Sequence, residues 1–456
     1  MQNDPRELKT QRWLVLAYCF NMDGQAASHH ITDKIPYLKR RGIEPIVVSA
    51  ATGYLDSDVE HHQVTSLAPS GLRFELRHII KMKFGIGIWG RFLRVLTAIV
   101  LLPFYALEKI FLQFDSQWSW FISAERKGRR LIQERPFDLI YVSGGASSAF
   151  LAAHRLSKKH DIPWVAEIYD PMIHDSWRRS RMAYWWNARM EKLICTHAKA
   201  AFWYTQEAIS QAKDRNPQLE DRGHLMRPGM MPPDFGEVMY VRSNNLRFSY
   251  FGGLTSERNL SVFAAALGRL LKERPELTTV LKVHQYGGGM DKVSQESFKQ
   301  MPETILVPHG RLEADPVTGK SGRQRVLEQM RQTDVLILMH GEGDICQLYF
   351  PSKIYEYLWA IRPILIFSPV PNHWNDILDS NTHYVVDQSD SVAVDKTLSR
   401  LLKDWEDGKL LDRPISQAHS VQAAVDLLLE HACSLNSKAH ECLSKGRNEI
   451  TDSRSN

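Results

Sequence analysis

Short apolar runs alternate with helical patterns along most of this chain. In the first half, strands are predicted at WLVLAYC (13–19), EPIVVSA (44–50), FDLIYVS (137–143), WVAEI (164–168) and AFWYT (201–205). A helix is predicted at 27–41, and others lie between the later strands. The apolar runs lack an alternation of period two, which favours parallel sheets covered by helices on both faces.

A second set of elements begins after the proline-rich segment RPGMMPPDFGE (227–237), which predicts a linker. Its strands are predicted at LRFSYF (246–251), TVLKVH (279–284), ILVPHG (305–310), DVLILMH (334–340) and PILIF (363–367). We therefore expect an α/β protein with two Rossmann-like, doubly wound domains, at 1–236 and 237–415. They should face a cleft at the carboxyl ends of their strands. Residues 416–456 are expected to form a C-terminal helix and a loose tail.

A basic and apolar insertion is expected at about 55–115. Six basic residues and one acid lie between positions 73 and 94, and the apolar run VLTAIVLLPFYAL follows at 95–107. That run is shorter than the roughly 18 to 20 apolar residues that span a bilayer. Two interpretations stay open: a segment at about 81–109 that lies on an anionic membrane face, or a helical hairpin packed on its own domain.

Charge and cysteine content narrow the class of protein. The net charge is +5, from 57 basic and 52 acidic residues, which is too mild to imply nucleic-acid binding. Five scattered cysteines predict neither a disulfide framework nor a zinc site, and the paired histidines at 29–30 and 61–62 have no acids at ligand spacing, so no metal is expected. The N-terminus has no apolar signal region. A cytoplasmic location is expected, peripheral on the inner face of the plasma membrane if the insertion binds lipid.

The segment FPSKIYEYLWAIRPILI (350–366) predicts an anion site at the start of a helix. Ile354, Tyr357, Leu358 and Ile361 recur at the spacing of one helix face, and Ser352 can cap the helix. Free backbone amides at a helix N-terminus, next to the ammonium group of Lys353, would attract an anion.

A second candidate loop is YFGGLTSERNL (250–260). Gly252 and Gly253 lie where a strand turns toward a helix, so a phosphate could approach bare backbone, and Arg258 could neutralise its charge. By itself the motif fits a plain tight turn with a surface arginine equally well. The phosphate interpretation gains because this loop and the FPSK loop both follow strands of one predicted sheet.

These motifs resemble a known family. FGGL…RN, DVLILMH…FPSKIYEYL…RPIL, DLIYVSGG, IPWVAEIYDP and the loop at Gly24 are similar to GT-B glycosyltransferases, in particular to the large retaining family 4. The resemblance implies a donor site for a nucleotide sugar, in which Glu356 binds the ribose. Arg258 and Lys353 would hold the diphosphate, and Gly252, Gly253 and Ser352 would line the site.

Two positions depart from the family pattern. Gly253 stands where many relatives have an arginine, and Leu348 stands where many have a second glutamate. Glu342 and Asp344 lie in the same loop and could replace that glutamate.

In the first domain, the candidate residues follow predicted strands. Asp170 could hydrogen-bond a sugar hydroxyl, or simply cap a turn before Pro171. The resemblance places the first loop and acceptor side at Gly24, Ser143, Gly144 and Gly145.

Together these expectations describe a retaining glycosyltransferase. It would move a sugar from a UDP- or GDP-linked donor to a glycan or lipid-linked acceptor, such as a polysaccharide precursor. Lys353, Arg258 and Asp170 are the expected catalytic residues, with no cofactor besides the nucleotide-sugar co-substrate and no nucleic-acid partner. A sugar-nucleotide epimerase on the same fold and a non-catalytic nucleotide-sugar-binding protein remain alternatives.

Overall fold

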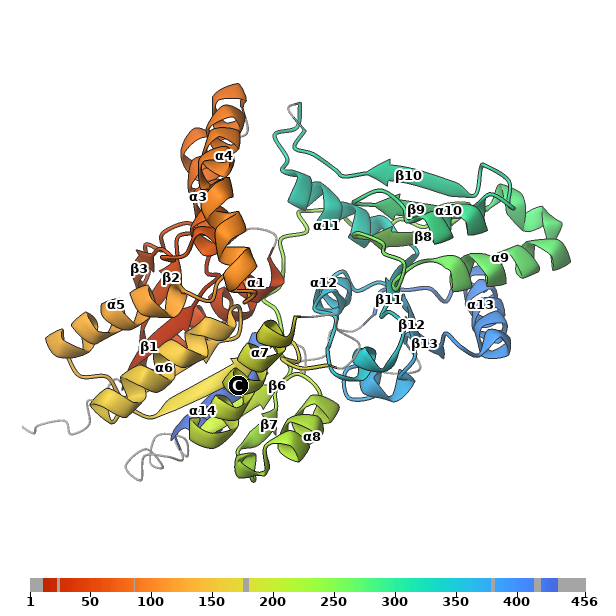
Figure 1. The fold of residues 1–456 in the computed structure, drawn as a ribbon. Coiled ribbons are helices and arrows are strands. Elements are labelled where there is room, and N and C mark those ends of the chain that lie inside the picture. Colours follow the sequence, from red (N-terminus) through yellow and green to blue (C-terminus); the bar gives the residue numbers. More distant parts are fainter. Residues whose placement is uncertain are drawn as a thin grey trace, which may run out of the picture. The chain divides into compact units, whose positions relative to one another are not determined.

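The computed structural model describes residues 11–22, 25–85, 87–174, 180–315, 317–378, 382–413 and 420–433. The chain divides into two compact units (Figure 1). The first unit comprises Met1–Gly229 and Val421–Asn456, and the second comprises Met230–Ser420. The division falls inside the proline-rich segment at 227–237. The tail after residue 433, which was expected to be loose, lies outside the described residues.

The first unit contains a sheet in which every described strand is parallel to its neighbours. The strand order is β3-β2-β1-β4-β5-β6-β7. The strands are β1 (Gln11–Ala17), β2 (Ile43–Ala50), β3 (Glu60–Val64), β4 (Leu139–Ser143), β5 (Trp164–Ile168), β6 (Ala200–Trp203) and β7 (Gly223–Leu225). Part of the expected insertion therefore belongs to the sheet, because β3 pairs with β2 along its edge.

Helices cover both faces of the first sheet, as the apolar pattern predicted. They are α1 (Ala26–Thr32), α2 (Ile35–Arg40), α3 (Pro69–Phe84), α4 (Ile88–Phe111), α5 (Trp120–Glu134), α6 (Ser147–His160), α7 (Arg181–His197), α8 (Gln206–Arg215) and α14 (Val421–Cys433). The single helix expected at 27–41 is in fact two, α1 and α2. Pro36 lies in the first turn of α2, where its missing amide donor costs nothing, whereas inside one long helix it would remove a hydrogen bond.

The C-terminal helix α14 packs on the first unit, although about 190 residues of the second unit separate them in the sequence. Val425 and Leu428 of α14 are fully buried in one core cluster with Val15 and Phe202 of the sheet. On the opposite face, Gly128 of α5 lies against the side chain of Leu14. The first unit therefore has one sheet with an apolar core on each side.

The second unit contains another parallel sheet, with strand order β10-β9-β8-β11-β12-β13. Its strands are β8 (Leu246–Phe251), β9 (Leu281–Tyr286), β10 (Leu306–Gly310), β11 (Val335–Met339), β12 (Ile364–Ser368) and β13 (Tyr384–Asp387). Its helices are α9 (Ser261–Glu273), α10 (Lys292–Phe298), α11 (Gly322–Gln332), α12 (Lys353–Trp359) and α13 (Ser391–Glu406). Apolar side chains of α9 and α13 form one large core cluster with β8 and its neighbours.

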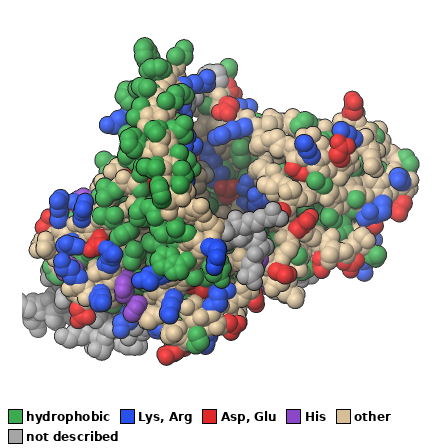
Figure 2. Space-filling model, viewed as in Figure 1, with side chains coloured by type: hydrophobic (Ala, Val, Ile, Leu, Met, Phe, Trp, Pro, Cys, Tyr) green, Lys and Arg blue, Asp and Glu red, His purple; other side chains and the backbone are tan. Residues whose placement is uncertain are grey.

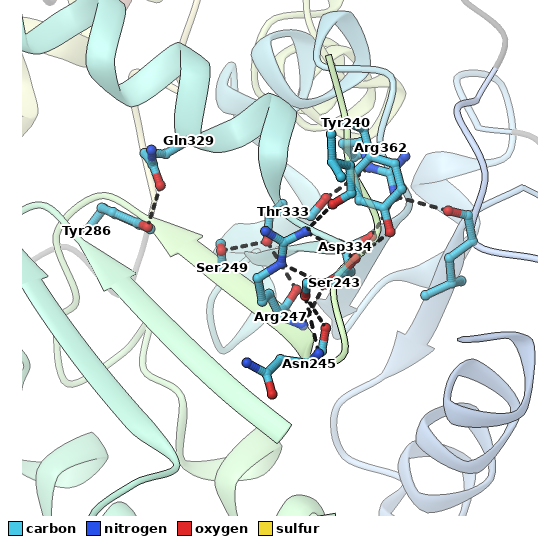
Figure 3. A network of polar contacts seen from close by, with 12 residues as sticks. Tyr240, Ser243, Asn245, Arg247, Ser249, Tyr286, Gln329, Thr333, Asp334 and Arg362 are labelled. Carbon is cyan, nitrogen blue, oxygen red and sulfur yellow. Dashed lines mark hydrogen bonds and ion pairs between the residues drawn. The ribbon is translucent and has the colours of Figure 1, made fainter. Parts of the chain in front are cut away.

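A polar network holds the starts of the central strands of this sheet (Figure 3). Asp334, fully buried directly before β11, accepts hydrogen bonds from the backbone amide and the Nε of Arg247, at 2.8 and 2.9 Å. Tyr240 donates its hydroxyl to the same carboxylate, and the guanidinium of the buried Arg362 lies 3.4 Å from the centroid of the Tyr240 ring. Because these buried charges are paired and hydrogen-bonded, their burial costs little free energy.

Helices α3 and α4 form a hairpin that projects from the first sheet (Figure 1). The carboxylate of Glu108, near the end of α4, accepts hydrogen bonds from the amide and hydroxyl of Ser70 at the start of α3, at 2.8 and 2.6 Å. The two helices therefore run antiparallel. Within the described residues α4 is the one helix long and apolar enough to cross a membrane, with a mean hydropathy of 1.6. The helix extends well beyond the apolar run at 95–107 at both ends.

Candidate functional site

The candidate site of the second unit lies where the order of the strands reverses. β8 and β11 are adjacent and parallel, yet the chain proceeds outward from β8 to β9 and outward from β11 to β12, in opposite directions. The loops that follow β8 and β11 therefore separate at the carboxyl edge of the sheet. In open α/β sheets this switch point is the usual ligand position.

The glycines after β8 bring two loops into backbone contact. Gly252 has a φ of +129°, and its amide donates to the carbonyl oxygen of Tyr286 at the end of β9, at 2.8 Å. A Cβ on Gly287 would stand 2.6 Å from the carbonyl oxygen of Gly252, so only glycine fits there. Gly253 is exposed, and a Cβ at that position would meet no atom within 4 Å. The loop thus presents bare backbone to open space.

Lys353 reaches from the start of α12 to the end of β8. Its Nζ donates a hydrogen bond to the carbonyl oxygen of Phe251 at 2.6 Å, and a Cβ on Gly252 would come within 2.9 Å of the same nitrogen. Burial lowers the pKa of Lys353, and the positive charges of Arg258 and Arg323 lower it further, while Glu356 opposes the shift. These positive charges are close enough to repel one another.

Arg258 contributes a second cation at the same strand ends. A tight turn shapes its loop, in which Thr255 and Arg258 exchange backbone hydrogen bonds of 3.0 and 3.1 Å. The Nε of Arg258 is buried and has no hydrogen-bond partner among the described residues. Burial lowers the pKa values of Lys353 and His340, which lie at the ends of other elements, and the guanidinium charge of Arg258 lowers both further. An unpaired buried donor beside two loops is suited to an anionic ligand.

The start of α12 differs from the sequence prediction in three respects. Ser352 makes no side-chain cap bond, so the capping prediction was wrong. The amides of Ile354 and Tyr355 already donate to the carbonyl oxygens of Pro351 and Ser352, at 3.1 and 3.2 Å. Ile361 lies beyond the helix, because its φ of +51° turns the chain toward β12. The positive character of the site therefore comes mainly from side chains.

Glu356 stands one turn after Lys353 on the same helix. Its carboxylate pairs with Arg323 of α11 at 2.7 Å, and its side chain is 14% exposed against 45% for Arg323. The ion pair holds the carboxylate in place while leaving part of it open to solvent.

The loop after β11 has an apolar side chain at position 348, where many members of the resembled family have a glutamate. Leu348 is buried, whereas Glu342 and Asp344 are exposed. His340, directly after β11, is fully buried, with its Nδ1 2.9 Å from the hydroxyl of Ser368. Burial lowers the pKa of His340 to about 4, so the ring is neutral at pH 7.

The first-unit candidates lie at the ends of β4 and β5. Ser143 is buried, and its hydroxyl is hydrogen-bonded to that of Tyr169. A Cβ on Gly144 would stand 2.5 Å from the carbonyl oxygen of Glu167, whereas Gly145 has more room. Asp170 is exposed directly after this region. Gly24 lies outside the described residues.

Two features of the structure were given no role from the sequence. Gly287 supports the Gly252 loop, and a glycine run directly after a predicted strand was the available signal. The second is a fully buried ion pair of Lys34 and Glu167, at 2.7 Å. The carboxylate of Glu167 also accepts hydrogen bonds from the hydroxyls of Tyr141 and Tyr204. A glutamate inside an otherwise apolar strand was the signal there.

No family model matches the sequence, and no curated protein matches it either. Several solved structures are similar. HepE from Anabaena, solved in complex with UDP and glucose, is 13% identical with a TM-score of 0.51, and the match covers 95% of this chain and 99% of that chain.

The α,α-trehalose 6-phosphate synthase of Burkholderia multivorans is 13% identical with a TM-score of 0.58, and the match covers 94% of this chain and 100% of that one. Sucrose-phosphate synthase from Thermosynechococcus elongatus is 10% identical with a TM-score of 0.52, and the match covers 98% of this chain and 100% of that one. At such identities the likeness shows the fold, which is two Rossmann-like doubly wound units of the GT-B type.

Proposed function

We propose that this protein is a glycosyltransferase that moves a sugar from a nucleotide-diphosphate sugar to an acceptor. The observation that carries the proposal is the pair of cations, Arg258 and Lys353, at the switch point of the second sheet. Beside them, Gly253 offers open backbone. A diphosphate needs such positive charges and donors, and HepE, which shares the fold, was solved with UDP.

In the proposed reaction, an acceptor hydroxyl oxygen forms a bond to the anomeric carbon while the bond between that carbon and the diphosphate oxygen breaks. Negative charge grows on the leaving diphosphate, which takes up the hydroxyl proton. Lys353 and Arg258 stabilise that charge in place, without reorganising during the reaction. Because burial and, to a smaller extent, the neighbouring cations lower the pKa of Lys353, a bound diphosphate would restore its preference for the charged form. The resemblance of the FGGL and FPSK motifs to retaining family 4 supports retention at the anomeric carbon.

We assign the ribose of the donor to Glu356. The ion pair with Arg323 orients its carboxylate, which stays partly open to solvent. The carboxylate expected at position 348 is replaced by a buried leucine, so Glu342 and Asp344, both exposed in the same loop, are the candidates to bind the sugar.

The acceptor side is assigned to the first unit. Asp170 is exposed two residues beyond the end of β5, and Gly144 and Gly145 follow the neighbouring strand β4. We propose a glycan or lipid-linked acceptor, such as a polysaccharide precursor, used at the cytoplasmic face of the plasma membrane. The unpaired thiols of Cys19, Cys195 and Cys346 are in keeping with a reducing compartment.

A thermal-shift panel of UDP, GDP, ADP and their sugars tests the donor. A ligand at a hundred times its dissociation constant should stabilise the folded chain by about 2.7 kcal/mol. The best donor is then incubated with and without lipid-linked and soluble glycan acceptors, and the products are identified by mass spectrometry. Transfer that requires an acceptor supports the proposal. A changed sugar nucleotide formed without any acceptor would identify an epimerase, and donor binding without any product would identify a binding protein.

A further inference from the structure

Helix α4 of the first unit carries a broad apolar surface that no described element of that unit covers (Figure 2). Its exposed apolar side chains are Ile88, Trp89, Phe92, Val95, Leu96, Ile99, Val100, Leu102, Phe104, Leu107, Ile110 and Phe111. At 100° per residue these positions span an arc of about 200° around the helix axis, over roughly 36 Å of its length. Only Gly90 and Glu108 of this helix are buried.

The charge around this surface has a single sign. Residues 69–111 contain seven basic side chains and two acids, Glu75 and Glu108. Both acids are buried: Glu75 accepts hydrogen bonds from Tyr18 and Ser66, and Glu108 accepts them from Ser70. The charges that the described hairpin presents to solvent are therefore all positive, and Lys81, Lys83 and Arg91 are among the exposed ones.

The width of the arc argues against a second protein helix as the partner. One helix covers a stripe of about 100° on its neighbour, and α3 already occupies the remaining side of α4. An arc twice as wide needs an apolar medium that surrounds the helix, such as the acyl chains of a lipid layer.

The antiparallel partner also rules out a spanning helix. α3 carries Arg73, Arg77, Lys81 and Lys83, which are costly inside hydrocarbon. Two contacts hold α3 against α4. Ser70 donates a hydrogen bond to Glu108, and the guanidinium of Arg73 lies 5.1 Å from the centroid of the Tyr105 ring. α4 therefore cannot cross a bilayer without drawing the charges of α3 into it.

We propose that the α3–α4 hairpin is a monotopic membrane anchor. α4 lies along an anionic lipid surface with its apolar arc among the acyl chains, and the lysines and arginines of the hairpin contact the headgroups. The rings of Trp89 and Phe92 pack edge to face, with their centroids 6.2 Å apart. The amphipathic ring of Trp89 and the apolar ring of Phe92 are suited to the boundary between lipid headgroups and acyl chains. This proposal stands independently of the transferase assignment.

Co-sedimentation with vesicles tests the anchor. The full chain is mixed with vesicles of phosphatidylcholine alone and of phosphatidylcholine with phosphatidylglycerol, and the bound fraction is measured at low and high salt. We expect binding that is stronger on the anionic vesicles and weakened by salt. The double variant Ile99→Glu/Leu102→Glu should bind vesicles at least roughly a hundredfold more weakly, since each carboxylate would enter hydrocarbon. Lys81→Glu should weaken anionic binding by about fivefold or more.

Val317→Glu is the matched control, because Val317 is an apolar side chain that is 91% exposed in the second unit. It should bind vesicles as the unaltered chain does. The replaced side chains are exposed, and equal thermal unfolding temperatures establish that each variant is folded. Equal vesicle binding by Ile99→Glu/Leu102→Glu and the unaltered chain overturns the proposal. The proposal is also overturned if the unaltered chain does not bind vesicles but forms a dimer in sedimentation velocity, and if the same double variant is monomeric.

Discussion

The ammonium group of Lys353 donates a hydrogen bond to the carbonyl oxygen of Phe251, 2.6 Å away, across 102 positions of the sequence. This contact joins the first residue of α12 to the last residue of β8, beside the exposed backbone of Gly253. It places a positive charge at the point where the strand order reverses, which is where a diphosphate would bind.

Removal of that charge should slow sugar transfer. We expect Lys353→Ala to lower turnover about a hundredfold, on the scale of losing one preorganised charge stabiliser. Lys282→Ala is the matched control, because Lys282 also donates to a backbone carbonyl, that of Thr304 at 2.8 Å, but from the start of β9. Steady-state kinetics with the identified donor measures both variants. Turnover of Lys353→Ala within twofold of the unaltered chain would show that the lysine has no catalytic role.

The two glycines of the first loop should differ in their tolerance of a side chain. Gly252→Ala puts a methyl group at a φ of +129° and 2.9 Å from the Nζ of Lys353, which must move away from Phe251. We expect a loss of stability of about 1–3 kcal/mol from the backbone strain, together with weaker donor binding. Gly253→Ala enters open space and should change stability by less than about 0.5 kcal/mol. Equal denaturation midpoints for the two variants would contradict this difference.

Glu356 should act in donor binding rather than in the chemical step. Loss of a carboxylate that binds ribose hydroxyls costs about 1.5–3 kcal/mol, so Glu356→Ala should weaken the donor by tenfold or more in calorimetry. Arg323→Ala is the companion variant, because it removes only the partner at 2.7 Å. Because the Arg323 side chain is 45% exposed, loss of this ion pair should cost less than about 1 kcal/mol of stability. An unchanged donor affinity in Glu356→Ala would remove the ribose assignment.

His340 should make the protein less stable in acid. Burial lowers its pKa in the folded chain to about 4, whereas an unfolded histidine titrates near its ordinary value of about 6.5. Between these values the unfolded chain binds more protons, so the contribution to the free energy of unfolding is full above about pH 6.5 and falls as the pH drops toward 4.

The slope from this single group approaches about 1.4 kcal/mol per pH unit inside that window. His340→Gln keeps a polar group near Ser368 but cannot titrate, so its stability should depend less on pH. Denaturant unfolding of both chains at several pH values measures the difference. Parallel stability curves would exclude His340 as a contributor.

Much of the fold follows from local patterns. The strands LRFSYF and WVAEI lie where the apolar runs predicted them, and helices cover both faces of the two parallel sheets. The errors concern ends and breaks. Ile361 continues the helical spacing of Ile354 and Leu358 but adopts a left-handed conformation, because the chain must turn there to enter β12. Periodicity records which side chains are apolar, and it does not record where the backbone turns.

The candidate site was less predictable than the fold. The glycines and cations of the two loops could be recognised as suited to phosphate from their residue types. The pairing of Glu356 with Arg323 and the use of the first α12 amides within the helix could not, since both depend on how α11 and the 351–352 turn pack. The buried Lys34–Glu167 pair was missed for the same reason, because its partners are 133 residues apart.

The sequence by itself determined the alternation of strands and helices, the two-unit organisation and the excess of positive charge around the 95–107 run, because these depend on neighbouring residues. Only the tertiary structure decided that α14 packs on the first unit, that Lys353 meets Phe251, and that the outer arc of α4 stays uncovered. Each of these depends on strand order and helix packing between segments far apart in the chain, which no local pattern encodes.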